Sequence, residues 1–367
     1  MAEVKPVRQA VVGQHYYVRS LSEGLRRRST LGGLVPELMR YLLEKGIVDS
    51  VVTVKSGPTP LGGVPAFITS PSEVEGVAGS VSYAPLNIAK VLRDYVRPDE
   101  RVAVTVKPCE ELAVKYLVDK GLFRRSNIFM IGLNCGGLFN PLLLSEALES
   151  AGSLGATDVK DIRFEKEYVE VVLKDGRSVR IRYMKEAVSK GYRPACMRCL
   201  NRVPKYSDIA CGYWGLLPEY RKYTYAIPLT RWGAEVLTGM IGEGRVEVLE
   251  APPEGRALRR ESIAFITMIS EIAREAQFDE LDSSDIAEIL SRCMMCLECW
   301  HACPIRSGKE IFVWRENTSP TVWQLSTLTY MYDKCVECGS CEDVCPVKIP
   351  FALLVQRVRA LRERLGV

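Results

Sequence analysis

The stretch KCVECGSCEDVCPVKIP, Lys334 to Pro350, contains the cysteine motif that determines the fold expected for the C-terminal part of the chain. Its cysteines follow one another with two, two and three residues between them, and a proline follows the last; they are Cys335, Cys338, Cys341 and Cys345. This rhythm is that of the bacterial ferredoxin run, in which three close cysteines wrap one [4Fe-4S] cube and the fourth reaches a second cube. One such run therefore predicts another.

The second run is CMMCLECWHACP, which supplies Cys293, Cys296, Cys299 and Cys303 at the same spacing, again with a proline after the last cysteine. Eight of the thirteen cysteines fall into these two frames, so we predict two cubane clusters. Zinc also accepts four thiolates, but its cysteine pairs usually stand further apart. Disulfides need an oxidising compartment, and the first twenty residues lack the apolar core of a signal peptide.

Composition and charge narrow the class of protein. The 367 residues are 47% hydrophobic, which predicts two or three domains with a large core. The 49 basic and 45 acidic residues are interspersed, so we expect no nucleic-acid partner. No apolar run reaches membrane-spanning length, and we expect a cytoplasmic protein. The only histidines are His15 and His301, and we assign both to surface or packing roles.

Strand-like and helix-like segments alternate from residue 30 to 150. Helices are predicted at 32–46 and 110–121, and strands at 50–55, 101–107 and 127–135. This is the pattern of an α/β sheet whose ligands bind beyond the strand ends. No GxGxxG motif occurs, so an ordinary dinucleotide-binding fold has little support.

Two later segments depart from this alternating strand and helix pattern. Residues 160–183 alternate apolar and polar residues around Asp175-Gly176, which predicts an inserted antiparallel hairpin. APPEGR, residues 251–256, has the composition of a linker. Beyond it we expect helices, one capped by Ser319 with Pro320 in its first turn and another at 351–365. The predicted domains are therefore an α/β domain at 1–250 and a helical two-cluster ferredoxin-like domain at 257–367.

Five cysteines remain outside the two runs. Cys109 and Cys135 each follow a predicted strand, and CMRCLNRVPKYSDIACG contributes Cys196, Cys199 and Cys211. Four thiolates that converge from two strand ends and one CxxC would hold a third cubane. Lone cysteines are also often buried as small apolar residues, and a CxxC can be a redox dithiol. The residues by themselves leave these alternatives open, with a third cluster preferred.

Several phrases, taken in order, resemble the beta-subunit family of coenzyme F420 hydrogenases and dehydrogenases over roughly residues 10–245: STLGGLVPELMRYLLEKGIVDS, GVAGSVSY, KPCEE, GLNCGG and CMRCLNRVPKYSDIACGYWG. The tail LSTLTYMYDKCVECGSCEDVCPVKIPF is similar to that of the beta subunit of archaeal F420-dependent formate dehydrogenases. The resemblance implies an archaeal oxidoreductase subunit that binds FAD, exchanges a hydride with F420 and passes single electrons through iron–sulfur clusters. Its partner would be a catalytic dehydrogenase or hydrogenase subunit.

The resemblance also implies site residues. Cys211 stands where the family normally has no cysteine, which leaves Cys109, Cys135, Cys196 and Cys199 as the third ligand set and Cys211 as a spare thiol. The family's flavin loop, Ser-Gln-x-Gly-Gly, is STLGG here, so its glycines match and its glutamine does not. The implied cofactor contacts are Ser29, Thr30, Gly32, Gly33, Gly79, Ser80, Ser82, Tyr83 and Lys107. Arg26, Arg27 and Arg28 would suit the phosphate and acidic tail of F420, although charge runs are usually exposed surface.

The expected reaction follows from what each cofactor carries. F420 and nicotinamides exchange hydrides, a cubane exchanges one electron, and a flavin does both, so FAD must stand at the junction. We expect hydride transfer between F420 and FAD, followed by electron transfer through three [4Fe-4S] clusters. The electrons would leave through the C-terminal clusters to a formate dehydrogenase. We expect no catalytic acid, base or nucleophile. The alternatives are the same relay with NAD(P)H or ferredoxin in place of F420, and an electron-relay or docking subunit without a flavin.

Overall fold

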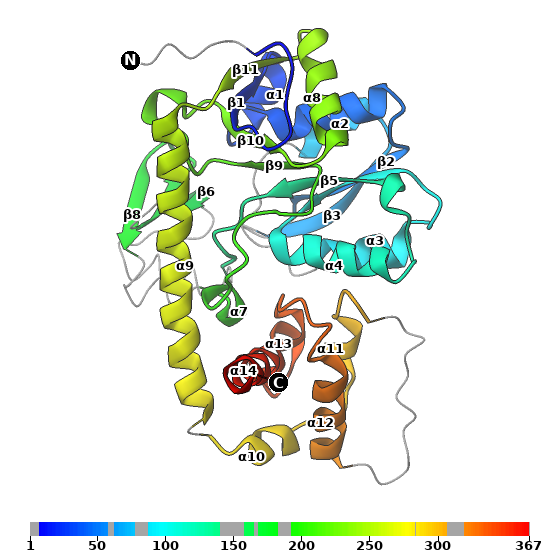
Figure 1. Cartoon of the computed structure of the whole chain (residues 1–367), viewed down its shortest axis with the longest axis vertical. Coiled ribbons are helices and arrows are strands. Elements are labelled where there is room, and N and C mark those ends of the chain that lie inside the picture. The colour runs from blue at the N-terminus through cyan, green and yellow to red at the C-terminus, as the bar shows by residue number, and fades with distance from the viewer. Residues whose placement is uncertain are drawn as a thin grey trace.

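A large mixed sheet forms the centre of the N-terminal part (Figure 1). The computed structural model describes residues 7–57, 62–77, 87–139, 158–164, 168–182, 192–282, 284–306 and 319–366. The sheet has eight strands in the order β11-β1-β10-β9-β5-β4-β2-β3. Their bounds are β1 Tyr16–Ser20, β2 Ser50–Ser56, β3 Gly63–Ile68, β4 Val102–Val106, β5 Ile128–Leu133, β9 Ile209–Gly212, β10 Thr224–Pro228 and β11 Val246–Glu250.

The parallel part of this sheet consists of β2, β4, β5 and β9. Helices α2 (Leu34–Glu44) and α8 (Arg231–Gly242) cover one face, and α3 (Ile88–Tyr95) and α4 (Pro108–Asp119) cover the other. Strand β4 is buried along its whole length because both of its faces are covered, which suits its run of valines. The helices and strands predicted between residues 32 and 135 are confirmed.

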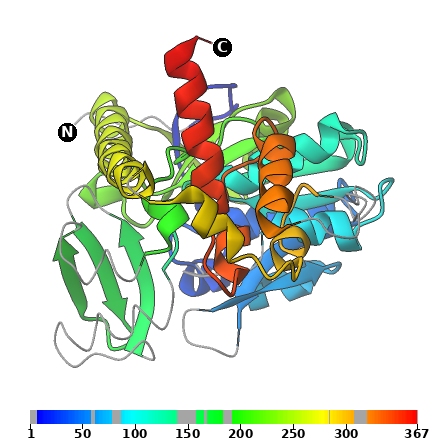
Figure 2. The same ribbon diagram turned by 90° about the horizontal axis from the view of Figure 1, so that it is seen from below.

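A second sheet is antiparallel and has three strands, β6 (Val159–Phe164), β7 (Tyr168–Leu173) and β8 (Ser178–Arg182). The predicted hairpin is β7–β8, and its turn contains Gly176 at φ 91°. Strand β6 adds a third strand that the pattern did not predict. The sheet lies beside helix α9 (Pro253–Asp282), as Figure 2 shows, and shares an apolar cluster with Ile266 of that helix.

The predicted linker at 251–256 is wrong, because most of it forms the first turn of α9, a helix of 30 residues. Proline is well tolerated in the first turn of a helix, where its missing N–H has no partner to lose, so the proline pair begins a helix here. Ala251 is only 1% exposed. Gly255 is buried and lies where an added Cβ would come within 2.0 Å of the Tyr17 hydroxyl. The segment is therefore part of the packed core.

The C-terminal part is helical, as predicted, but it is continuous with the α/β core. Its helices are α10 (Ile286–Ser291), α11 (Glu298–His301), α12 (Pro320–Met331), α13 (Ser340–Val344) and α14 (Phe351–Leu365). Ser319 caps α12 as predicted, accepting a hydrogen bond from the N–H of Val322 at 3.3 Å. Met331 and Phe351 belong to the same buried cluster as the apolar residues of α3 and α4. The two parts therefore do not have separate cores.

The remaining short elements are α1 (Glu23–Arg28), α7 (Pro194–Met197) and the 3-10 turns Pro71–Val77, Arg125–Asn127 and Pro218–Tyr220. No helix within the described residues is both long and apolar enough to cross a membrane.

We expect Gly255→Ala to lower the free energy of unfolding by about 1–3 kcal/mol, because the new methyl group collides with Tyr17 and with the Gly215 carbonyl. The matched control is Gly242→Ala, also in a helix, where an added Cβ meets nothing within 4 Å. Denaturant unfolding followed by circular dichroism compares the two variants. Equal stability of both variants would contradict the close packing of α9 against Tyr17.

Candidate functional site

The two ferredoxin-like runs form two cavities in the C-terminal part. Cys303, Cys335, Cys338 and Cys341 line one of about 400 Å³, counted to its open mouth. Cys293, Cys296, Cys299 and Cys345 line the other, of about 330 Å³, and Cys299 borders both. Each cavity thus takes three cysteines from one run and the last cysteine of the other run. This exchange is the arrangement of a two-cluster ferredoxin.

The backbone around these cavities adopts conformations that L-residues rarely take. Within the described residues, the non-glycine residues with positive φ are Met295, Leu297, Glu337 and Lys348, all inside the two runs. The N–H of Met295 donates to Cys293 Sγ at 3.3 Å, and the N–H of Glu337 donates to Cys335 Sγ at 3.4 Å. Such turns aim backbone N–H groups at a negatively charged ligand, and conformational strain of this kind gathers at functional sites.

The cavities suit a cluster of several atoms. All thirteen cysteines are free of disulfide bonds. No three His, Cys, Asp or Glu side chains of the described residues gather closely enough to bind a single metal ion. A zinc ion would lie about 2.3 Å from each of four sulfurs, so those sulfurs would have to converge on one point, and the sulfurs of the described cysteines do not. The larger core of a [4Fe-4S] cube accepts four sulfurs that lie further apart.

A third group of cysteines lies at the strand ends of the large sheet. Cys109 is in the first turn of α4, Cys135 follows β5, Cys196 is in α7, and Cys199 follows α7. Burial raises the pKa of the Cys135 thiol to about 12, and the neighbouring thiolates of Cys196 and Cys199 act in the same direction. Burial also raises the pKa of Cys109, with Glu110, Cys338, Cys199 and Cys135 as charged neighbours. The structure therefore brings together the four cysteines of the predicted third set.

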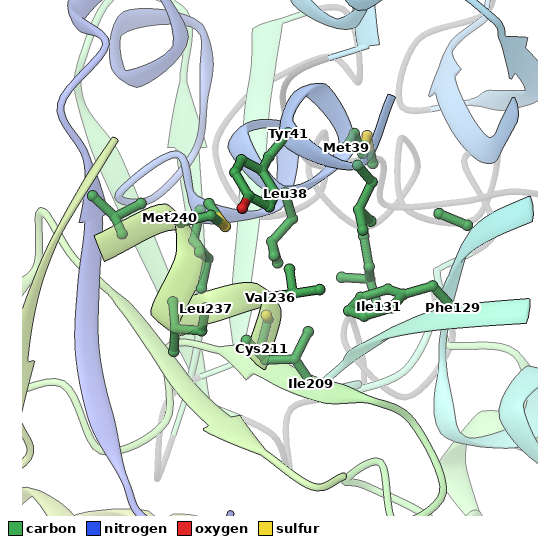
Figure 3. Close-up of a cluster of buried hydrophobic side chains, with 14 of the residues drawn as sticks. Leu38, Met39, Tyr41, Phe129, Ile131, Ile209, Cys211, Val236, Leu237 and Met240 are labelled. Carbon is green, nitrogen blue, oxygen red and sulfur yellow. The ribbon is translucent and has the colours of Figure 1, made fainter. Parts of the chain in front are cut away.

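Cys211 is separated from this group by the direction of its side chain. It points into the apolar core between the sheet and helices α2 and α8, beside Leu38 and Val236 (Figure 3). Burial raises the pKa of its thiol to about 12, and its charged neighbour is Arg259. These surroundings are those of a small apolar residue.

A large pocket opens at the carboxyl ends of the parallel strands, the usual ligand position in an α/β sheet. It encloses about 1410 Å³, counted to its open mouth. Its walls include Ser29, Thr30 and Gly33 from the loop before α2, Lys107 after β4, and residues 134–139 after β5. Cys135 belongs both to this wall and to the third cysteine group, so a ligand in the pocket would lie beside that group.

The predicted flavin loop has two glycines with different roles. Gly33 caps α2 at φ 77° and borders the pocket. Gly32 does not border it; an added Cβ there would lie 2.7 Å from the Val18 carbonyl oxygen and 2.8 Å from the Tyr223 Cα. Gly32 therefore allows the loop to pass close to the sheet. The predicted contacts Gly79, Ser80, Ser82 and Tyr83 lie outside the described residues.

Polar groups line the pocket near Cys135. Lys107 Nζ pairs with Glu110 Oε1 at 2.8 Å. Burial acts to lower the pKa of Lys107, but Glu110 and the thiolates of Cys109 and Cys135 outweigh it, so that pKa is raised. Asn134 Nδ2 is buried and has no hydrogen-bond partner among the described residues. Asn134 itself borders the pocket.

Sequence reasoning missed Asn134 and also Thr53 and Thr105, whose hydroxyl oxygens lie 2.9 Å apart at the pocket. The available signal was a polar residue close to the end of each of three apolar strands, β2, β4 and β5.

The third cysteine group touches the C-terminal cysteine groups directly. Arg193, which is 8% exposed, donates to Cys196 Sγ at 3.6 Å and to the Cys338 carbonyl at 3.2 Å. Gly339, at φ 71°, lies where an added Cβ would approach the Ala195 Cβ to 2.2 Å. Neighbouring loops of the two groups are therefore packed as closely as a glycine permits.

Comparison with known proteins identifies three matching family regions. Residues 15–93 match the N-terminal and residues 99–254 the C-terminal region of the coenzyme F420 hydrogenase/dehydrogenase beta subunit. Residues 292–349 match the 4Fe-4S dicluster domain.

Relatives extend this result along the whole chain. The F420-dependent formate dehydrogenase subunit beta of Methanocaldococcus jannaschii is 29% identical over 96% of this chain and 95% of its own length. The F420-dependent formate dehydrogenase 1 subunit beta of Methanococcus maripaludis is 30% identical over 90% of this chain and 76% of its own. Among solved structures, a chain of the F420-reducing [NiFe] hydrogenase complex from Methanosarcina barkeri shares the fold, with a TM-score of 0.62, 20% identity, and coverage of 75% of this chain and 95% of that one.

We expect Gly339→Ala to reduce stability by about 2–4 kcal/mol, because it adds a clash with Ala195 to the cost of a positive φ. Gly121→Ala is the matched control: its φ is 73°, and an added Cβ meets nothing within 4 Å, so it bears only the conformational cost of about 1 kcal/mol. Denaturant unfolding of both variants under anaerobic conditions gives the comparison. If the two costs are the same, the two loops are not in contact.

Proposed function

Because the chain belongs to the coenzyme F420 hydrogenase/dehydrogenase beta-subunit family, and is therefore a subunit of an oxidoreductase, we propose the following function. The chain moves a hydride between coenzyme F420 and FAD, and single electrons through three [4Fe-4S] clusters to or from a catalytic partner subunit, a formate dehydrogenase. The observation that supports this most is the shared position of Cys135 in the pocket wall and in the third cysteine group.

The pocket has the features that a flavin requires. Its volume is large, its walls include apolar side chains such as Leu138 and Phe139, and the amide of Asn134 has an unused buried donor for a ring acceptor. The ammonium of Lys107 also lies in the wall, and because an ammonium has three donors it can bind a phosphate or other polar group beside its ion pair with Glu110. FAD would accept a hydride and release electrons one at a time when bound. The apolar walls would exclude water from the ring.

The basic run before this loop offers sites for the anionic groups of F420. Arg26 Nη1 is held by the Ser20 carbonyl at 2.7 Å. The side chains of Arg27 and Arg28 are 77% and 59% exposed, and their partners Glu23 and Glu75 are exposed as well. Exposed ion pairs of this kind are weak and exchange easily. Arg27 and Arg28 can therefore bind an acidic tail at the pocket's edge.

The three cysteine groups form a path from the pocket to the surface. Cys135 of the third cysteine group begins it, Cys338 lies beside Cys109 of that same group, and Cys303 links the two C-terminal runs. Cys296 is exposed and belongs to the group furthest along this path. We assign the exit toward the partner to that group. A truncation after Ala251 would remove the C-terminal cysteine groups, but it would not test this exit. It would also uncover the core shared by α3, α4 and α14.

We expect the chain, purified without oxygen, to release about one FAD on denaturation, and its bound flavin to bleach with reduced F420 and not with NADH. Asn134→Ala should weaken FAD binding about tenfold, since a buried hydrogen bond is lost. Asn127→Ala, in an exposed turn, is the control. A chain that releases no flavin would support the electron-relay alternative, and bleaching by NADH would support a nicotinamide partner.

Iron analysis tests the ligand sets. Three cubanes correspond to about twelve irons per chain, and each of Cys135→Ser and Cys199→Ser should lose about four of them. Cys211→Ser should lose none, because Cys211 lies in the apolar core. Retention of iron in Cys135→Ser together with its loss in Cys211→Ser would replace our ligand set with another.

A further inference from the structure

A second pocket lies on the opposite face of the large sheet. It encloses about 790 Å³, counted to its open mouth, between the first turns of α9 and strands β9 and β10. Side chains alternate between the two faces of a strand, so Cys211 of β9 borders the first pocket while Ala210 borders the second. A ligand in this second pocket would therefore be separated from the first pocket by the sheet.

One wall of the pocket carries three arginines of α9, Arg256, Arg259 and Arg260. Their spacing of three and four residues places them on one face of the helix. Within the described part of the chain, Arg256 pairs with Glu250 at a long distance of 3.7 Å. Arg260 is exposed and forms no ion pair with a described residue. The wall is thus strongly cationic.

Arg259 is the most deeply buried of the three. It is 6% exposed, and its guanidinium donates to the Trp214 carbonyl and to Asn134 Oδ1, both at 3.4 Å, and lies 4.8 Å from the centre of the Tyr225 ring. No carboxylate of a described residue lies within ion-pair distance. Burial lowers its pKa. A buried cation without a counter-ion is costly, and an anion in the pocket would remove that cost.

His15 adds a further donor to the pocket lining. His15 Nδ1 lies 2.6 Å from the Tyr225 hydroxyl. Burial, and then the charges of Arg259, Arg256 and Arg260, lower the pKa of His15, which keeps the imidazole neutral at neutral pH. When Tyr225 donates to Nδ1, the ring proton is on Nε2, where it can donate to a ligand. None of the described residues that line the pocket is acidic.

The rest of the pocket is apolar, with lining side chains Val203, Pro204, Ala210, Ile227, Leu229 and Ile263. The three arginines and this apolar floor together match a molecule that carries an anionic group on an apolar body. We propose that this pocket binds an organic anion, whose carboxylate or phosphate group contacts Arg259 and Arg260 and whose body lies on the apolar floor. This site goes beyond the proposed hydride and electron transfer and does not depend on it.

The test is calorimetric titration of the full chain, purified without oxygen, with phenyl phosphate, benzoate, inorganic phosphate and benzyl alcohol. We expect saturable binding of phenyl phosphate or benzoate at one site per chain, weaker binding of inorganic phosphate and none of benzyl alcohol. Arg260→Gln should weaken the binding of the organic anion about tenfold, as a charge-assisted hydrogen bond is lost. Arg231→Gln, at a side chain that is 91% exposed on α8, should leave it unchanged.

Arg259→Gln should weaken binding at least as much, and circular dichroism shows whether this buried variant folds. Because Arg260 is exposed, its variant decides the question even if the Arg259 variant does not fold. Absence of saturable binding of both organic anions, or equal affinity in Arg260→Gln and the unchanged chain, rejects the site. Inorganic phosphate that binds as tightly as phenyl phosphate rejects the organic ligand.

Discussion

The contact between the CxxC segment and the C-terminal helices holds the third cysteine group against the run that contains Cys338 and Cys341. Arg198, which is 1% exposed, donates to Gln356 at 2.6 Å, to Gln277 at 2.8 Å and to Glu342 at 2.6 Å. These partners belong to α14, α9 and α13, so one guanidinium holds three helices beside Cys199. A buried ion pair adds little net stability, but loss of one partner leaves an uncompensated charge and is strongly destabilising. The contact is therefore a strict requirement of the assembled structure.

The same contact explains why the C-terminal part is not an appendage. Electron transfer between clusters requires short distances, and a flexible tether would let the groups separate. Here α9 starts within the core of the large sheet, runs past the small sheet and ends at the C-terminal helices (Figure 1). Arg93 of α3 also donates to the Cys303 carbonyl at 3.0 Å. The proposed path from the pocket to Cys296 thus runs through one continuous core.

Most individual elements could be predicted because their signals are local. The apolar periodicity of α2, the valine run of β4, the Asp175-Gly176 turn and the Ser319 cap each depend on neighbouring residues, and each was confirmed. The segment 251–256 was misassigned because proline and glycine have two meanings. They mark linkers, but they also allow a helix to start and to approach another backbone closely, and only the contact of Gly255 with Tyr17 distinguishes the two.

The sequence by itself determined the family resemblance and the presence of a dicluster domain, because the spacing within a run restricts where its sulfurs can lie. Only the tertiary structure decided which distant groups meet. Cys109 and Cys135 meet because β4 and β5 are parallel neighbours whose carboxyl ends share one edge, and the segment that follows the CxxC is held there by the hydrogen bond from the Cys135 N–H to the Arg202 carbonyl. The unpaired donor of Asn134 and the uncompensated charge of Arg259 are likewise properties of folded surroundings. Whether a side chain is buried, and whether a hydrogen-bond or ion-pair partner lies near it, depends on residues far apart in the chain. No local sequence pattern contains that information.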